Sequence, residues 1–77
     1  MALARKETLL EDVQKDGEVL VLSDGRRLAI VNADDATIAS IWLPTARMAL
    51  QRGRGRTVLV TNVDTGETVS ARELLSR

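Results

Sequence analysis

This chain of 77 residues lacks several residue types on which common kinds of site depend. It has no cysteine, so neither a disulfide framework nor a thiolate zinc site is available to it. It has no histidine, which removes the commonest metal ligand and the commonest general base. Phenylalanine and tyrosine are also absent, and Trp42 is the single aromatic residue. These absences exclude serine triads and the aromatic grooves that bind proline-rich peptides.

Long apolar runs are missing as well. No stretch approaches the roughly 18 apolar residues that a membrane-spanning helix needs. Arg5 and Lys6 follow the start too soon for the apolar core of a signal peptide. We therefore expect a cytoplasmic protein that makes no contact with membranes.

The length allows one domain, which we place at residues 7–75 after a flexible tail at residues 1–6. A chain this short buries only about 60% of its unfolded surface, so its stability is expected to be marginal. Without disulfides or thiolate metal sites, a dimer interface is the remaining natural source of extra stability. A protein partner or a homo-oligomer is therefore expected.

The net charge is zero, yet the charges are unevenly distributed along the chain. Residues 1–45 carry eight acidic and five basic residues, a net charge of −3. Residues 46–77 carry six basic and three acidic residues, a net charge of +3. Such asymmetry can orient a partner or a second copy, but it does not determine the fold.

Short apolar segments alternate with turn signals along the chain. The turns are expected at Asp16-Gly17, Asp24-Gly25, Gly53 to Gly55 and Asp64-Thr65-Gly66. The segments between them predict five strands, at residues 18–23, 26–31, 47–52, 57–63 and 67–71. The expected fold is mainly β: a small SH3-like five-stranded antiparallel barrel with one short helix in the middle. A partly open barrel, or a sheet with a helix packed on it, is the alternative.

Three segments need separate interpretation. Residues 7–16 suit a helical turn and an irregular strand equally well. Residues 32–42 predict a short helix capped by Asn32 or Asp34 and stopped by Pro44, with Ile38, Ile41 and Trp42 on one face. We expect the Trp42 indole to plug the barrel end, the alternative being an exposed partner-binding side chain. Residues 72–75 are expected to form a helical turn at the barrel mouth.

Three groups of residues between Gly17 and Ala71 carry a resemblance. They are the Leu22-Ser-Asp-Gly25 hairpin, Asp35 with Trp42-Leu-Pro, and Asn62-Val-Asp-Thr-Gly-Glu67. The chain resembles small uncharacterised bacterial β-barrel proteins, in which a Leu-x-Asp-Gly hairpin, an Asp…Trp helical turn and an Asn-x-Asp-x-Gly-Glu hairpin follow one another. It departs from that pattern at Leu28, where an aromatic residue is frequent, and at Thr45-Ala46, where Gly-Asp is common. The resemblance implies the fold and no activity.

The segment from Arg52 to Arg56, with the sequence Arg-Gly-Arg-Gly-Arg, has the strongest chemical character. Arg52, Arg54 and Arg56 lie on an expected hairpin tip, and Arg47 lies in the strand before it. Guanidinium groups contact phosphates in a bidentate manner, and glycine allows close approach of the backbone. A solvated, solubilising tip is the interpretation that needs no partner. Contact with phosphate or with an acidic partner surface is the functional alternative.

No carboxylate arrangement predicts catalysis or a metal site. Asp34 and Asp35 are neighbours at a helix start, where helix capping explains them and their side chains diverge. We therefore expect no catalytic residues, no cofactor, no metal and no enzymatic activity. The expected function is an interaction or accessory module that acts by protein–protein contact or self-association. The less favoured alternative is a weak nucleic-acid-binding module that uses the arginine tip.

Overall fold

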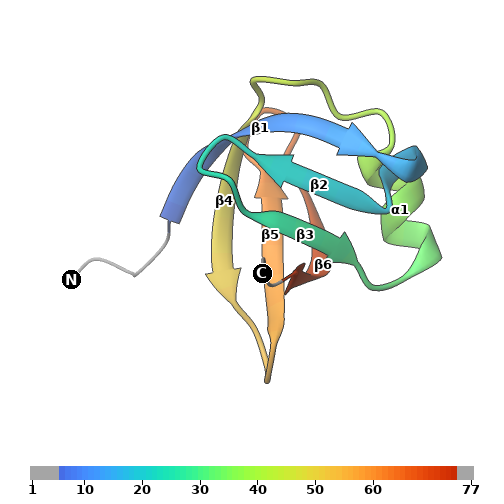
Figure 1. The fold of residues 1–77 in the computed structure, drawn as a ribbon, viewed down its shortest axis with the longest axis vertical. Helices are drawn as coiled ribbons and strands as arrows, with labels where there is room; N and C mark the ends of the chain where they lie inside the picture. The colour runs from blue at the N-terminus through green and yellow to red at the C-terminus, as the bar shows by residue number, and fades with distance from the viewer. Residues whose placement is uncertain (1–5, 75–77) are drawn as a thin grey trace.

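The computed structural model describes residues 6–74, which form a closed antiparallel barrel of six strands and one short α-helix (Figure 1). The strands are β1 (Lys6–Gln14), β2 (Val19–Leu22), β3 (Arg27–Ile30), β4 (Arg47–Arg52), β5 (Thr57–Asn62) and β6 (Glu67–Leu74). A one-turn 3-10 segment, η1 (Lys15–Gly17), follows β1, and the helix α1 (Ala33–Ala39) follows β3. The order around the barrel is β1-β2-β3-β6-β5-β4, and β4 closes it against β1. The mainly β barrel with one short helix is confirmed, but the expected strand number of five was too low.

The additional strand is β1, which lies in the segment that suited helix and strand equally. Its first half, Lys6 to Leu9, pairs with β4, and its second half, from Leu10 to Gln14, pairs with β2. A bulge between Leu10 and Asp12 shifts the register. Because of this bulge, the apolar residues Leu9, Leu10 and Val13 do not alternate, which is why their spacing resembled a helical turn.

Three hairpins form as expected from their turn residues: β2–β3, β4–β5 and β5–β6. The last strand is longer than expected, because β6 continues to Leu74 and pairs there with Arg27 of β3. The helical turn expected at residues 72–75 is therefore wrong for residues 72–74, and Leu75 lies outside the described residues. Of the tail expected at residues 1–6, Lys6 belongs to β1, and residues 1–5 lie outside the described part.

The core fills the barrel with aliphatic side chains. Its fully buried large residues are Leu10, Leu20, Leu22, Leu28, Met48, Val60 and Val69, with Trp42 at one end. Strands β2 and β5 have apolar residues on both faces, yet little of their outer face is exposed. Outward-facing Val19 is 7% exposed, and Val21 and Leu59 are half-buried.

Antiparallel pairing places the connections at two opposite ends of the barrel. The β4–β5 tip, the last residues of β6 and Arg27 at the start of β3 share one end, which we call the hairpin end, whereas the β2–β3 turn lies beside Thr8 and Leu9 of β1. The segment η1, the helix α1, the loop of residues 40–46 and the β5–β6 turn share the other, which we call the helix end. Figure 1 shows that the β4–β5 hairpin extends beyond the rest of the barrel.

The helix α1 begins where it was expected and ends earlier. Asn32 is its N-cap, and the Asn32 side chain accepts a hydrogen bond from the Asp35 backbone N–H at 2.9 Å. The helix ends at Ala39, five residues before Pro44, so Pro44 does not stop it. Ile41 and Trp42 therefore lie in the following loop, where Trp42 is buried and Ile41 is exposed. Within residues 6–74, neither α1 nor η1 is long or apolar enough to cross a bilayer.

Candidate functional site

Two polar contacts fasten the α1 region to β6 at the helix end. One Asp35 carboxylate oxygen accepts a hydrogen bond from the Ser70 backbone N–H at 2.9 Å, beyond the part of β6 that pairs with β3. The same oxygen accepts a hydrogen bond from the Asn32 side chain at 3.1 Å. The Trp42 indole N–H donates to a Glu67 carboxylate oxygen at 2.8 Å. These contacts connect two of the three groups that carried the resemblance, the group of Asp35 and Trp42 and the group that ends at Glu67, so they have a structural role as clamps.

The loop of residues 40–46 is held firmly between these clamps and β1. The Trp42 backbone N–H donates to the Ala39 carbonyl at 3.0 Å, and that of Thr45 donates to the Leu10 carbonyl at 2.7 Å. The Leu10 N–H donates in turn to the Ala46 carbonyl at 2.9 Å. The loop therefore presents its side chains in a defined geometry.

Alternate side chains of this loop face opposite ways. Trp42 is 4% exposed, whereas its neighbours Ile41 and Leu43 are 74% and 72% exposed. We call Ile41 and Leu43 together the apolar loop pair. The sequence predicted Ile41 on the same helix face as Trp42. Because α1 ends at Ala39, both residues lie in the loop, and Ile41 is exposed.

Negative charge surrounds the helix end. The connections at residues 15–18, 31–46 and 63–66 contain five carboxylates and one ammonium group, a net charge of −4. These carboxylates are Asp16, Glu18, Asp34, Asp35 and Asp64, and the ammonium group is that of Lys15. Asp34 and Asp35 do not act as a pair, because Asp35 is bound to Asn32 and Ser70 while Asp34 points to solvent.

A groove of about 520 Å³ also opens at the helix end, between η1, α1 and the outer side of β2 and β3. Its walls are mainly small or aliphatic, with Val19, Ala29, Val31 and Ala36 among them. In residues 6–74, each buried side-chain polar atom has a hydrogen-bond partner, and no group of three or more acidic residues is close enough to hold a metal ion. Lys15, Asp16 and Glu18 line the η1 side of the groove, so it is a shallow cleft with one apolar and one charged wall.

The structure separates the four arginines expected to act together. Arg52 ends β4, and Arg54 and Arg56 lie in the following tip at the hairpin end. Arg47 begins β4 at the opposite end of the strand. There it forms an ion pair of 3.4 Å with Asp64. Arg47 is therefore not part of the tip.

The barrel adds two arginines to the tip that the sequence did not associate with it. Arg72 of β6 lies opposite Thr57, the first residue after the tip, and Ala29 of β3 flanks it on the other side. Arg27 is two residues from Ala29 on the same face of β3. Arg27 and Arg72 are 45 residues apart in the sequence, and Arg56 and Arg72 are 16 apart. The sequence gave no local sign that they meet, because only the pairing of β3, β6 and β5 brings them together.

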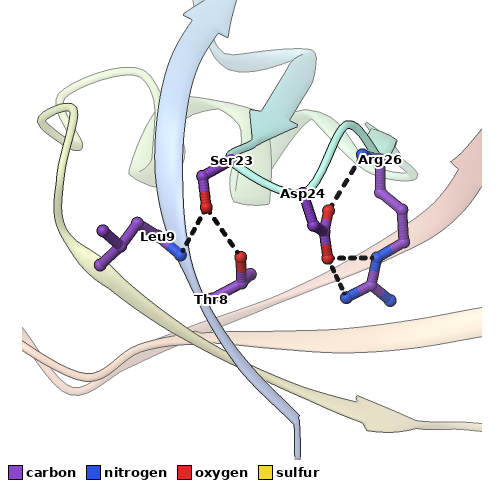
Figure 2. Close-up of polar contacts among 5 residues, drawn as sticks. All are labelled: Thr8, Leu9, Ser23, Asp24 and Arg26. Atoms are coloured by element: carbon purple, nitrogen blue, oxygen red, sulfur yellow. Dashed lines mark hydrogen bonds and ion pairs between the residues drawn. The ribbon is translucent and has the colours of Figure 1, made fainter.

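Arg26 precedes Arg27 in the β2–β3 turn, and its charge is neutralised by Asp24. Figure 2 shows the Asp24 carboxylate between the backbone N–H and the guanidinium of Arg26, with an ion pair of 2.8 Å. The neighbouring Ser23 hydroxyl accepts a hydrogen bond from the Leu9 N–H at 3.4 Å and shares one of 3.1 Å with the Thr8 hydroxyl (Figure 2). The β2–β3 turn is thus tied to itself and to β1.

No protein-family model, curated protein or solved structure gives a significant match to this chain. The resemblance to small bacterial β-barrel proteins therefore stays a prediction.

Proposed function

We propose that this chain is a non-catalytic interaction module that docks on a protein partner through its apolar loop pair. The observation that carries the proposal is the exposure of Ile41 and Leu43, at 74% and 72%, on either side of the buried Trp42. Exposed aliphatic side chains that enter a partner's pocket contribute strongly to binding, because they bury apolar surface on association.

Preorganisation supports the same proposal. The loop is held by hydrogen bonds from Thr45 to Leu10 and from Trp42 to Glu67. A loop that is already ordered loses little conformational freedom on binding, so more of the contact energy appears as affinity. The clamps thus prepare Ile41 and Leu43 for contact.

Charge favours a different protein over a second copy as the occupant. A symmetric dimer through this surface would bring two helix ends together, each with a net charge of −4 in its connections. Like charges placed face to face at an interface cost several kcal/mol. The expected partner surface is therefore an apolar pocket with a basic rim.

The test is site-specific photo-crosslinking in the cells that make the protein, with a photoreactive residue in place of Leu43. A heterologous protein is expected to crosslink there, and Ile41→Ser introduced in the same chain is expected to abolish the product. Leu9→Ser is the matched control, since Leu9 is 44% exposed and lies on β1 outside the apolar loop pair. Only homodimer crosslinks, or a product unaffected by Ile41→Ser, would refute the proposal.

Self-association is examined by sedimentation of the purified protein at micromolar concentration. A monomer agrees with the proposal, whereas a dimer that Ile41→Ser dissociates would assign the surface to a second copy.

The predictions of an SH3-like barrel, a bacterial relationship and a cytoplasmic location belong to this proposal, as does the absence of enzymatic activity.

A further inference from the structure

We propose that the hairpin end binds double-stranded DNA, with the β4–β5 hairpin in the major groove and flanking arginines on the phosphate backbone. This surface is opposite the apolar loop pair, so the inference is independent of the proposed protein contact. It uses Arg27 and Arg72 together with the tip arginines, and it does not use Arg47.

Five exposed arginines lie at this end, and their guanidinium groups form no hydrogen bond or ion pair with any of residues 6–74. They are Arg27, Arg52, Arg54, Arg56 and Arg72. The acidic residues nearby offset little of this charge. Asp24 is occupied by Arg26, and Glu73, which follows Arg72 on β6, offsets one of the five arginine charges. The hairpin end thus has a net positive field.

The arginines are arranged in two groups of different height. Arg54 and Arg56 lie in the turn between β4 and β5, with Arg52 at the end of β4. Figure 1 shows that this connection projects from the barrel. Arg27 and Arg72 lie lower on the outer face of β3 and β6, where diagonal neighbours are about 7–8 Å apart. One group therefore projects while the other remains on the barrel wall.

The part that projects beyond the paired strands is the turn of residues 53–56, which joins β4 to β5. The last described β1 partner of β4 is Lys6, opposite Leu50, so Gln51 and Arg52 pair with β5 alone, while β5 pairs with β6 from Thr57 onward. The major groove of B-DNA, about 12 Å wide, admits a two-stranded β-ribbon, and a turn that joins two neighbouring strands has that width. The major groove of double-stranded RNA is too deep and narrow for one. The projecting turn therefore fits DNA better than RNA.

The choice of a duplex over a single strand follows from aromatic content. Single-strand binders stack bases on aromatic side chains, and Trp42, the one aromatic residue, is buried at the opposite end. Contacts to phosphate remain available, and these bind without regard to sequence.

The test measures fluorescence anisotropy of a labelled 20-base-pair DNA duplex between 50 and 200 mM salt. Five phosphate contacts predict a slope of about −4.5 for log K against log salt, which is a loss of about 500-fold over this range. Substituting Arg54→Gln and Arg56→Gln together is expected to reduce the slope by about 2, and Arg27→Gln with Arg72→Gln by the same amount.

Arg47→Gln is the matched control, because Arg47 is on the same strand but paired with Asp64 at the helix end. It is expected to leave the slope unchanged. Duplex RNA, single-stranded DNA and poly-glutamate serve as competitors, and each is expected to compete at least tenfold less well than duplex DNA.

Four results would overturn the inference: no binding at 50 mM salt, a slope that both double variants leave unchanged, equal competition by RNA, or equal competition by poly-glutamate. The last result would assign the surface to an acidic protein. Circular dichroism of each variant establishes that the substitutions at these exposed positions leave the barrel folded.

Discussion

At the scale of single residues, Gly17 determines how closely η1 approaches α1. Its φ is +94°, and a Cβ built there would lie 2.1 Å from the Ala36 carbonyl oxygen. Lys15 and Asp16, just before it, also have positive φ values of 54° and 57°. Three consecutive left-handed residues are costly without tertiary support, and the packing of Gly17 on α1 supplies that support.

Gly17→Ala is therefore expected to destabilise the barrel severely, by more than about 3 kcal/mol, because backbone atoms of α1 must move. Gly25→Ala is the control, since its φ of +95° is nearly the same but a Cβ there meets nothing within 4 Å. It is expected to cost only about 1–2 kcal/mol from the left-handed backbone. Urea denaturation of both variants measures the difference, and equal losses would contradict a steric role for Gly17.

At the scale of elements, the attachment of α1 to β6 depends on Asp35. Asp35→Ala removes the acceptor of the Ser70 N–H and is expected to lower the free energy of unfolding by about 1–3 kcal/mol. Amide hydrogen exchange at Ser70 should accelerate, while the β6 amides that pair with β5 remain protected. Asp34→Ala is the control, at an expected cost of about 0.5 kcal/mol from the helix dipole. Ser70 exchange that does not change in Asp35→Ala would refute the clamp.

The sequence predicted those elements whose signals are local. The Asp24-Gly25 turn predicted the β2–β3 hairpin, and Asn32 predicted the start of α1. The β1 strand was not decided, because its bulge between Leu10 and Asp12 breaks the alternation that identifies a strand. The early end of α1 was missed because the Trp42–Glu67 hydrogen bond, between residues 25 apart, draws the chain out of the helix.

The candidate sites were less predictable, because they depend on pairing between distant segments. Arg52, Arg54 and Arg56 are close in sequence and stay close in the structure. Arg47 is equally close in sequence, but a strand of six residues carries it to the opposite end. Arg72 joins the tip only through its register with Thr57, and residue spacing gives no indication of register.

At the scale of the whole molecule, Leu10 lies on β1, the strand that closes the barrel by pairing with both β4 and β2. It is 1% exposed at the bulge where β1 changes its partner from β4 to β2. Leu10→Ala is expected to cost about 2–5 kcal/mol, which is a large part of the stability of so small a domain. Leu10→Met, which conserves volume, is expected to cost less than about 1.5 kcal/mol.

Leu9→Ala is the adjacent control, with an expected loss of about 1 kcal/mol or less, because Leu9 is 44% exposed on the outer face. Thermal unfolding followed by circular dichroism and by Trp42 fluorescence gives the three midpoints. Trp42 is the single tryptophan, so its emission reports on the helix end alone. Equal midpoints for Leu10→Ala and Leu9→Ala would show that closure does not depend on Leu10.

The order of strands has a consequence for the newly synthesised chain. Among the described strands β6 comes last along the chain, yet it lies between β3 and β5 and joins the two halves of the barrel. On a translating ribosome, β1 to β5 can pair only as an open sheet until β6 leaves the exit tunnel. During that interval β3 and β5 expose unpaired edges, which the finished barrel covers. Protection from misassociation is therefore acquired in a single step, when β6 pairs with both edges.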